Sequence, residues 1–200
     1  MAKKLNNDDI SHFIDNDLYV PTRTVYIGPM SSVEYEVNAM MAERAIKNLH
    51  ILDSKSSEPI EIISLNYGGG VLEGMAIYDS IKLCRSSVTM KIFGCANSMG
   101  SVILQAADKR LIAPNAEVML HYGYASYGEN HPKAIRNAQK KDRKYDMWMV
   151  DLYLEKIREK VPNFTRAQLD KWLDFDKYMT AEEAIKYGLA DAIIETHTDT

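Results

Sequence analysis

The feature that most constrains the fold is an alternation of short apolar segments with amphipathic ones across the first half of the chain. Three segments of strand length are rich in β-branched residues, and each is followed by a segment whose apolar residues recur at helical spacing. The expected strands cover 24–28, 60–65 and 87–93, and the expected helices cover 31–49, 71–83 and 101–108. This order favours parallel strands joined by right-handed crossovers. The sequence therefore predicts an α/β fold around a parallel sheet, in a single domain over residues 1–200.

The second half continues with shorter elements and one long helix. Thr165 with Gln168 is expected to cap a short helix that ends at residue 173, and Thr180 with Glu183 forms a capping box for a helix over 181–187. A strand over 117–120 ends on His121, and a helix that begins with a proline covers 132–160. That helix is longer than a small sheet can cover, so we expect it to project or to pack on another subunit. A final strand is expected over 189–194. Residues 1–17 are polar, and we expect this segment to be mobile.

The stretch Gly94–Gly100 lies where the third expected strand turns into a helix. The turn would lift the Ser98 hydroxyl clear of the sheet, in front of the unpaired N–H groups of a helix N-terminus. Such groups stabilise a developing oxyanion. A serine at this place is more often an ordinary helix cap, and on this stretch alone that explanation stays open. Cys95, in the same turn, is expected to be a small buried side chain rather than a nucleophile.

Two further segments are expected at the same edge of the sheet. The three glycines Gly68–Gly70 follow the second strand and would let a ligand backbone or a reacting carbonyl approach closely. His121 follows the strand over 117–120 and is a candidate general base. A flexible turn and a structural histidine are the ordinary explanations of these two features. Because the carboxyl ends of parallel strands form the sites of such sheets, their convergence with Ser98 favours a catalytic site.

Charge and composition argue against several classes of protein. The net charge of −4 disfavours a broad nucleic-acid-binding surface. No apolar run reaches the roughly 18 residues of a membrane span. The first residues lack the apolar core of a secretory signal, so we expect a cytoplasmic protein. Two cysteines, Cys84 and Cys95, make neither a disulfide framework nor a zinc site.

Four sequence motifs occur along the chain, and their order and spacing are more specific than any single motif. They are Asn66–Val71 with Gly74–Asp79, Gly94–Gly100, Pro114–His121, and Asp176–Ala184 with Tyr187–Leu189. In this order they resemble the proteolytic subunit family of the Clp proteases (ClpP). The second motif is similar to the family's nucleophile turn, Gly-x-Ala-Ala-Ser-Met-Gly. The resemblance extends from about residue 13 to residue 194.

The resemblance implies a Ser-His-Asp triad. Ser98 would be the nucleophile, His121 the general base, and Asp176 the residue that orients the imidazole and stabilises its cation. The backbone N–H groups of Gly70 and Met99 would form the oxyanion hole. The function implied is that of a serine endopeptidase.

The resemblance also implies a crotonase-like β-α superhelix, in which the helix over 132–160 is a protruding handle. By this handle two seven-membered rings of the same chain would stack into a tetradecamer. The family degrades unfolded polypeptides that a separate AAA+ ATPase of the ClpX or ClpA type delivers. That partner uses the ATP, and this chain, which has no Walker A motif, is expected to hold no cofactor and no metal. Neither nucleic acid nor membrane is an expected partner.

The chain departs from the family pattern at several positions. Gly68 replaces a proline in the glycine-rich loop, and 122–126 replaces the Gln-Pro-x-Gly-Gly that follows the histidine. The segment before residue 13 has no likeness to the family's axial-pore segment, to which the ATPase docks. Asp170 and Asp174 also remain rivals of Asp176 for the third catalytic position.

Two other functions stay open. A crotonase-fold enzyme that acts on acyl-CoA would use backbone N–H donors at similar places without needing a Ser-His-Asp set. An inactive, structural subunit of a mixed ring would be expected to have lost a member of the triad, whereas all three candidates are present in this sequence.

Overall fold

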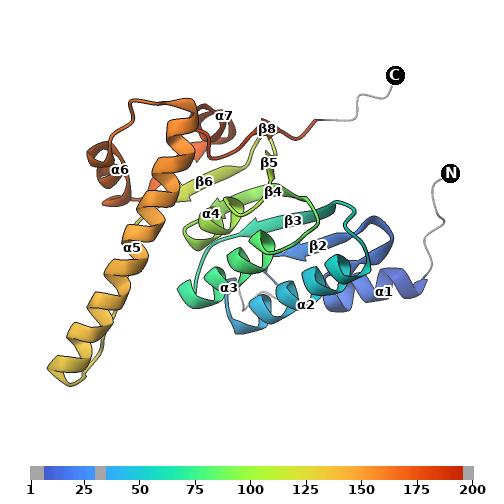
Figure 1. Cartoon of the computed structure of the whole chain (residues 1–200), viewed down its shortest axis with the longest axis horizontal. Coiled ribbons are helices and arrows are strands. Elements are labelled where there is room, and N and C mark those ends of the chain that lie inside the picture. The colour runs from blue at the N-terminus through green and yellow to red at the C-terminus, as the bar shows by residue number, and fades with distance from the viewer. Residues whose placement is uncertain (1–6, 30–34, 196–200) are drawn as a thin grey trace.

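The computed structural model describes residues 7–29 and 35–195, and Figure 1 shows how the elements are arranged. In chain order they are α1 (Asn7–Asn16), β1 (Leu18–Tyr19), a 3-10 turn (Val20–Thr22), β2 (Thr24–Ile27), α2 (Ala39–Lys55), β3 (Ile60–Asn66), α3 (Val71–Lys82), β4 (Val88–Asn97), α4 (Met99–Leu104), β5 (Lys109–Ile112), β6 (Glu117–Leu120), α5 (Pro132–Lys160), α6 (Arg166–Leu173), β7 (Lys177–Thr180), α7 (Ala181–Lys186) and β8 (Ala192–Ile193).

The strands form one mostly parallel sheet. Its main path runs β1-β2-β3-β4-β5-β8, and β6 joins β4 on one side and β7 on the other. All pairs are parallel except β1 with β2 and β6 with β7, which are antiparallel. The predicted α/β class with a parallel sheet is confirmed, and the two antiparallel pairs are an addition that the alternation of elements did not indicate.

Strand β4 is central to the site because it changes partner along its length. Thr89–Ile92 pair with β5, whereas Cys95–Asn97 pair with β6. The change occurs around Gly94, which has a φ of +69°. The register of β4 against β3 also shifts there. The carboxyl end of β4 therefore leaves the main sheet and belongs to a branch formed with β6 and β7.

Helices α2 and α3 lie along the sheet, whereas the long helix α5 extends away from it. In Figure 1, α2 and α3 run side by side along the sheet, and their apolar faces bury side chains such as Leu49, Leu52 and Ile77. Helix α5 has the predicted extent and projects from the body. Its buried residues all lie between Met149 and Ile157, so its first half has little contact with the body. No helix in the described ranges is long and apolar enough to cross a membrane.

Two segments near the N-terminus differ from the sequence prediction. Asn7–Asn16, within the segment expected to be mobile, form α1, and the carbonyl of Asn16 accepts a hydrogen bond from Asn48 Nδ2 at 2.7 Å. Helix α2 begins at Ala39, well after the predicted start at residue 31, where the expected cap lies outside the described residues. The helix starts late because Val37 is engaged in a β-bridge with Gly69, which is distant in the chain, and Asn38 then supplies the cap.

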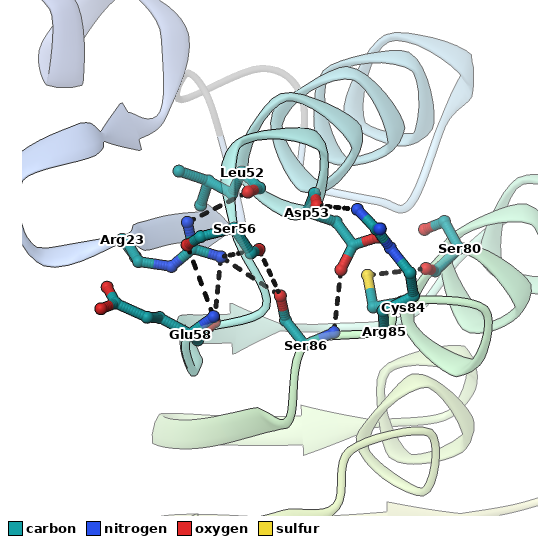
Figure 2. A network of polar contacts seen from close by, with 9 residues as sticks. All are labelled: Arg23, Leu52, Asp53, Ser56, Glu58, Ser80, Cys84, Arg85 and Ser86. Atoms are coloured by element: carbon teal, nitrogen blue, oxygen red, sulfur yellow. Dashed lines mark hydrogen bonds and ion pairs between the residues drawn. The ribbon is translucent and has the colours of Figure 1, made fainter.

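Arg23 ties four segments together at the amino ends of the central strands (Figure 2). Its guanidinium donates to the carbonyl oxygens of Leu52, Ser56, Glu58 and Pro59 at 2.9–3.2 Å, and to Ser86 Oγ at 3.2 Å. Leu52 and Ser56 lie at the carboxyl end of α2, where helix carbonyls lack their full set of partners; the Leu52 carbonyl accepts only a long bond from the Ser56 N–H, at 3.4 Å, besides that from Arg23. The cluster lies at the edge of the sheet opposite to the carboxyl ends of the parallel strands.

Candidate active site

Ser98 lies between β4 and α4 in a conformation that side chains rarely adopt. Its φ is +52° and its ψ is −122°, at a cost of roughly 1–3 kcal/mol. Backbone hydrogen bonds hold this turn, since the Ser98 N–H donates to the Met119 carbonyl at 2.8 Å and the Ser98 carbonyl accepts from the Ser101 N–H at 2.9 Å. Helix α4 begins right after Ser98, two residues earlier than predicted, and has only six residues. The turn presents the Ser98 side chain at the carboxyl end of β4.

The antiparallel ladder of β6 and β7 explains why His121 and Asp176 meet. Leu120 pairs with Lys177 at the end of the ladder. Because the strands are antiparallel, His121, which follows Leu120, faces Asp176, which precedes Lys177. His121 Nδ1 lies 3.0 Å from Asp176 Oδ1, and His121 Nε2 lies 2.7 Å from Ser98 Oγ. Both are hydrogen-bond distances. The structure thus brings together the three side chains that the sequence analysis selected.

Asp170 and Asp174, the rivals for the third position, have other partners. Asp170 Oδ1 accepts a hydrogen bond from the Tyr122 hydroxyl at 2.7 Å. Asp174 is the C-cap residue of α6, and its backbone N–H donates to the Asp170 carbonyl. Burial raises the pKa of Tyr122, and the bond to Asp170 raises it further, so this hydroxyl stays protonated. Asp170 therefore anchors the residue after His121 rather than His121 itself.

The site is open to solvent on one side. The His121 side chain is 14% exposed and that of Asp176 is 39% exposed. The ring of Tyr124, which is 92% exposed, stands edge-on to the imidazole with 5.6 Å between the ring centroids. Tyr124 therefore lies beside the imidazole while its own side chain stays exposed to solvent.

The glycine-rich loop lies directly against the Ser98 turn. A Cβ atom on Gly68 would lie 2.6 Å from Ser98 Cβ and 2.7 Å from the Asn97 carbonyl oxygen. The φ of Gly68 is +90°, which a proline ring forbids. Asn66 fixes this loop, because its Oδ1 accepts the Gly68 N–H at 2.9 Å. The glycine found in place of the family's proline is therefore required by the path of the loop in this chain.

The prediction that Gly70 contributes to an oxyanion hole conflicts with this geometry. The Gly70 N–H donates to the Val37 carbonyl at 2.7 Å, and the Val37 N–H donates to the Gly68 carbonyl at 2.7 Å. In this parallel bridge Val37 bonds to both neighbours of Gly69, so the N–H of Gly69 itself faces away from Val37. Met99, the other predicted donor, occupies the first position of α4, where a helical N–H has no acceptor within the helix.

Contacts that no motif indicated support the turn from α5. The Tyr145 hydroxyl donates to Met99 Sδ at 2.9 Å, and its ring stacks on Trp148 with 6.0 Å between centroids. These residues lie 46 positions or more from the Ser98 turn, and no local sequence signal links them to it. Cys95 is 5% exposed and burial raises the pKa of its thiol, so the prediction of a buried structural cysteine is confirmed.

Comparison with known proteins gives a consistent result. The family model described as Clp protease matches residues 25–197. The ATP-dependent Clp protease proteolytic subunit of Deinococcus radiodurans is 35% identical over 162 residues, which cover 80% of this chain and 76% of that protein. Proteolytic subunit 1 of Chlamydia abortus is 32% identical over 169 residues, or 79% of this chain and 82% of that protein. The chloroplastic subunit 3 of Arabidopsis thaliana is 30% identical over 176 residues, or 86% of this chain and 53% of that protein.

The match includes the Ser98 turn, His121, Asp176 and the long helix α5. It also includes the mostly parallel sheet from β2 to β8. The chain therefore belongs to the Clp protease family and is a serine peptidase of its proteolytic-subunit type.

Proposed function

We propose that this chain is a serine endopeptidase that hydrolyses peptide bonds of unfolded polypeptides, as the proteolytic subunit of a compartmentalised protease. The observation that carries the proposal is the line of contacts from Asp176 through His121 to Ser98, at 3.0 and 2.7 Å. A serine hydroxyl is a poor nucleophile at neutral pH unless an adjacent base accepts its proton. An imidazole oriented by a carboxylate is such a base.

In the acylation step, Ser98 Oγ attacks the carbonyl carbon of the scissile peptide while His121 Nε2 accepts its proton. The Nδ1–H of His121 donates to Asp176, which selects this tautomer and stabilises the imidazolium. The imidazolium then gives its proton to the leaving amine as the C–N bond breaks, and an ester to Ser98 remains. A water molecule, deprotonated by His121, hydrolyses that ester and restores the hydroxyl. No step requires a cofactor or a metal in this chain.

The oxyanion of the tetrahedral intermediate needs donors that are fixed in advance. We assign the Met99 N–H as one donor and the Gly69 N–H as the other, in place of Gly70, whose N–H is engaged by Val37. Gly69 is supported by its orientation away from Val37 and by the close approach of its neighbour Gly68 to Ser98. Loss of one such donor costs about 10²–10³ in turnover in serine proteases.

We also propose that the chain assembles into two stacked seven-membered rings through α5. The support is the uneven burial of this helix: Met147 is 57% exposed, whereas all of the buried residues lie between Met149 and Ile157. The relatives are described as ATP-dependent, which fits an AAA+ ATPase of the ClpX or ClpA type as the separate partner that uses ATP and delivers unfolded chains in the cytoplasm.

The test is labelling of the purified chain with a fluorophosphonate probe, read by peptide mass spectrometry, with light scattering on the same sample. We expect one adduct, on Ser98, in a ring-sized assembly, and none in a Ser98→Ala variant that still assembles. An assembled ring without any adduct would contradict the nucleophile and favour the structural subunit. Turnover of an acyl-CoA thioester that survives Ser98→Ala would favour the acyl-CoA enzyme.

A further inference from the structure

The carbonyl of Ser98 has an unusual set of partners for so strained a residue. Besides the N–H groups of Ser101, at 2.9 Å, and Val102, at 3.4 Å, it accepts a hydrogen bond from the Ser101 hydroxyl at 2.6 Å. The Ser101 hydroxyl in turn lies 2.6 Å from the Tyr153 hydroxyl, and Tyr153 belongs to α5. Three oxygens thus form a line from the long helix to the backbone of the nucleophile.

The direction of the protons in this line follows from the chemistry of its end. A carbonyl oxygen only accepts, so the single proton of the Ser101 hydroxyl goes to Ser98. The bond between Ser101 and Tyr153 must then have the Tyr153 hydroxyl as donor. Burial raises the pKa of Tyr153, so its hydroxyl is protonated at neutral pH and can donate. Tyr153 is 1% exposed and Ser101 is 0% exposed, so water does not compete for these bonds.

The peptide group that this line holds is also the one that carries the proposed oxyanion donor. The Ser98 carbonyl and the Met99 N–H belong to a single planar, trans unit, in which the two groups point in opposite directions. Fixing the oxygen on the inner side therefore fixes the N–H on the outer side. A strained conformation such as that of Ser98 persists only where its surroundings determine it strongly.

We propose that Tyr153 and Ser101 are positioning residues that orient the Ser98–Met99 peptide group and with it the Met99 N–H. This inference rests on the proposed function. It makes α5 a part of the catalytic apparatus, although none of its residues touches the reacting atoms in this role. Because the Ser101 N–H also holds the Ser98 carbonyl, at 2.9 Å, we expect loss of the line to loosen the peptide group rather than to free it.

The experiment compares Tyr153→Phe, Ser101→Ala and the double variant as assembled proteins. We expect each single change to lower kcat for a fluorogenic peptide by about three- to twentyfold, below the full loss of a donor. KM should stay within about twofold, since ground-state binding is not altered. The rate of fluorophosphonate labelling should fall in parallel. The double variant should be no slower than the slower single variant, because both changes interrupt one line.

A matched control is Tyr127→Phe, which removes another tyrosine hydroxyl. In the unaltered protein that hydroxyl donates to Asp142, in the first half of α5, at 2.6 Å. Its kcat should remain that of the unaltered protein. A lower melting temperature with unchanged kcat and labelling in the Tyr153 and Ser101 variants would show a merely structural line and overturn the proposal, as would losses that multiply in the double variant. If Tyr153→Phe does not assemble, Ser101→Ala alone decides.

Failure of the proposed function is recognised separately. The unaltered protein would then show no adduct on Ser98, and the positioning proposal would fall with it. If the unaltered protein is labelled on Ser98 and the Tyr153 and Ser101 variants keep its kcat and labelling rate, only the positioning proposal is overturned.

Discussion

Replacement of Gly68 by alanine tests the packing between the glycine-rich loop and the nucleophile. The added Cβ would lie 2.6 Å from Ser98 Cβ, whereas carbon atoms pack at about 3.5–4.0 Å, so one of the two segments must move by about 1 Å. Overpacking of this kind costs about 1–3 kcal/mol. The φ of +90° adds about 1–2 kcal/mol for a residue with a side chain. We expect Gly68→Ala to lower the free energy of unfolding by about 2–5 kcal/mol.

Catalysis should be impaired even in the molecules that remain folded. A displacement of about 1 Å at a catalytic group lowers turnover about a hundredfold. We therefore expect kcat/KM for a fluorogenic peptide to fall about a hundredfold or more, with the remaining protein still folded at 25 °C. Activity is measured with the peptide, and stability by denaturant unfolding at one fixed protein concentration, because assembly makes stability depend on concentration.

Gly128 provides the control that separates backbone from packing. Its φ is +55°, but a Cβ there would meet no atom within 4 Å. Gly128→Ala should therefore lose only the backbone part, about 1 kcal/mol, and keep full activity. If Gly68→Ala matched Gly128→Ala in both stability and kcat/KM, the close approach of loop and nucleophile would be refuted.

Three further predictions concern stability. Arg23→Ala should lower the free energy of unfolding by about 2 kcal/mol because four carbonyls lose a charged donor, and Arg23→Lys should recover only part of it, as read by urea unfolding. Arg110→Leu should lower the free energy of unfolding by about 2–3 kcal/mol, because the buried oxygens of Gln105 and Gly188 lose their donor and Asp191 loses its ion-pair partner; an unchanged melting temperature would contradict this. Acid should destabilise the fold. The Ser86 N–H and Arg85 lower the pKa of Asp53 from 3.8 to about 2. Burial raises the pKa of Asp191, but its hydrogen bonds and ion pair with Arg110 outweigh burial and lower that pKa. Both carboxylates stabilise the protein above pH 3.8, and this stabilisation is lost as the pH falls toward 2. The melting temperature should therefore fall between pH 5 and pH 2.5, and it should fall less steeply in Asp53→Asn.

Elements with complete local signals were predicted well from the sequence. Helix α5 follows a proline at its first turn, and α6 and α7 each begin at a capping box that the structure forms, at Thr165 and Thr180. Strands β2 and β3 are continuous apolar runs in parallel pairing. In each case the information lies within a few neighbouring residues, where periodicity and capping act.

Elements that depend on distant partners were not predicted. Strand β5, with the exposed Lys109 and the paired Arg110, lacks an apolar pattern of its own and exists because β4 and β8 flank it. The late start of α2 depends on a bridge from Val37 to Gly69, 32 residues away in the chain. The same bridge engages the N–H of Gly70, which conflicts with its predicted role as an oxyanion donor. Pairings of this kind leave no mark in local sequence.

The side chains of the proposed triad were selected through motif order, but their mutual geometry could not be predicted in this way. The sequence left Asp170, Asp174 and Asp176 as rivals, and the antiparallel register of β6 and β7 distinguishes them. The contacts of Tyr145 and Tyr153 with the Ser98 turn come from α5, and tyrosines at helical spacing on an amphipathic helix are usually core residues.

Among the described strands β7 pairs only with β6, so a single short ladder holds Asp176, the proposed third member of the triad, against His121. If that ladder opens, Asp176 leaves His121, while the bond from the Ser98 N–H to Met119 joins β4 to β6 and is not broken. Local opening of this edge would thus silence the enzyme reversibly and leave the nucleophile turn intact. Amide hydrogen exchange in Lys177–Thr180, compared with exchange in β4, would measure what fraction of the molecules is in that silent state at any moment.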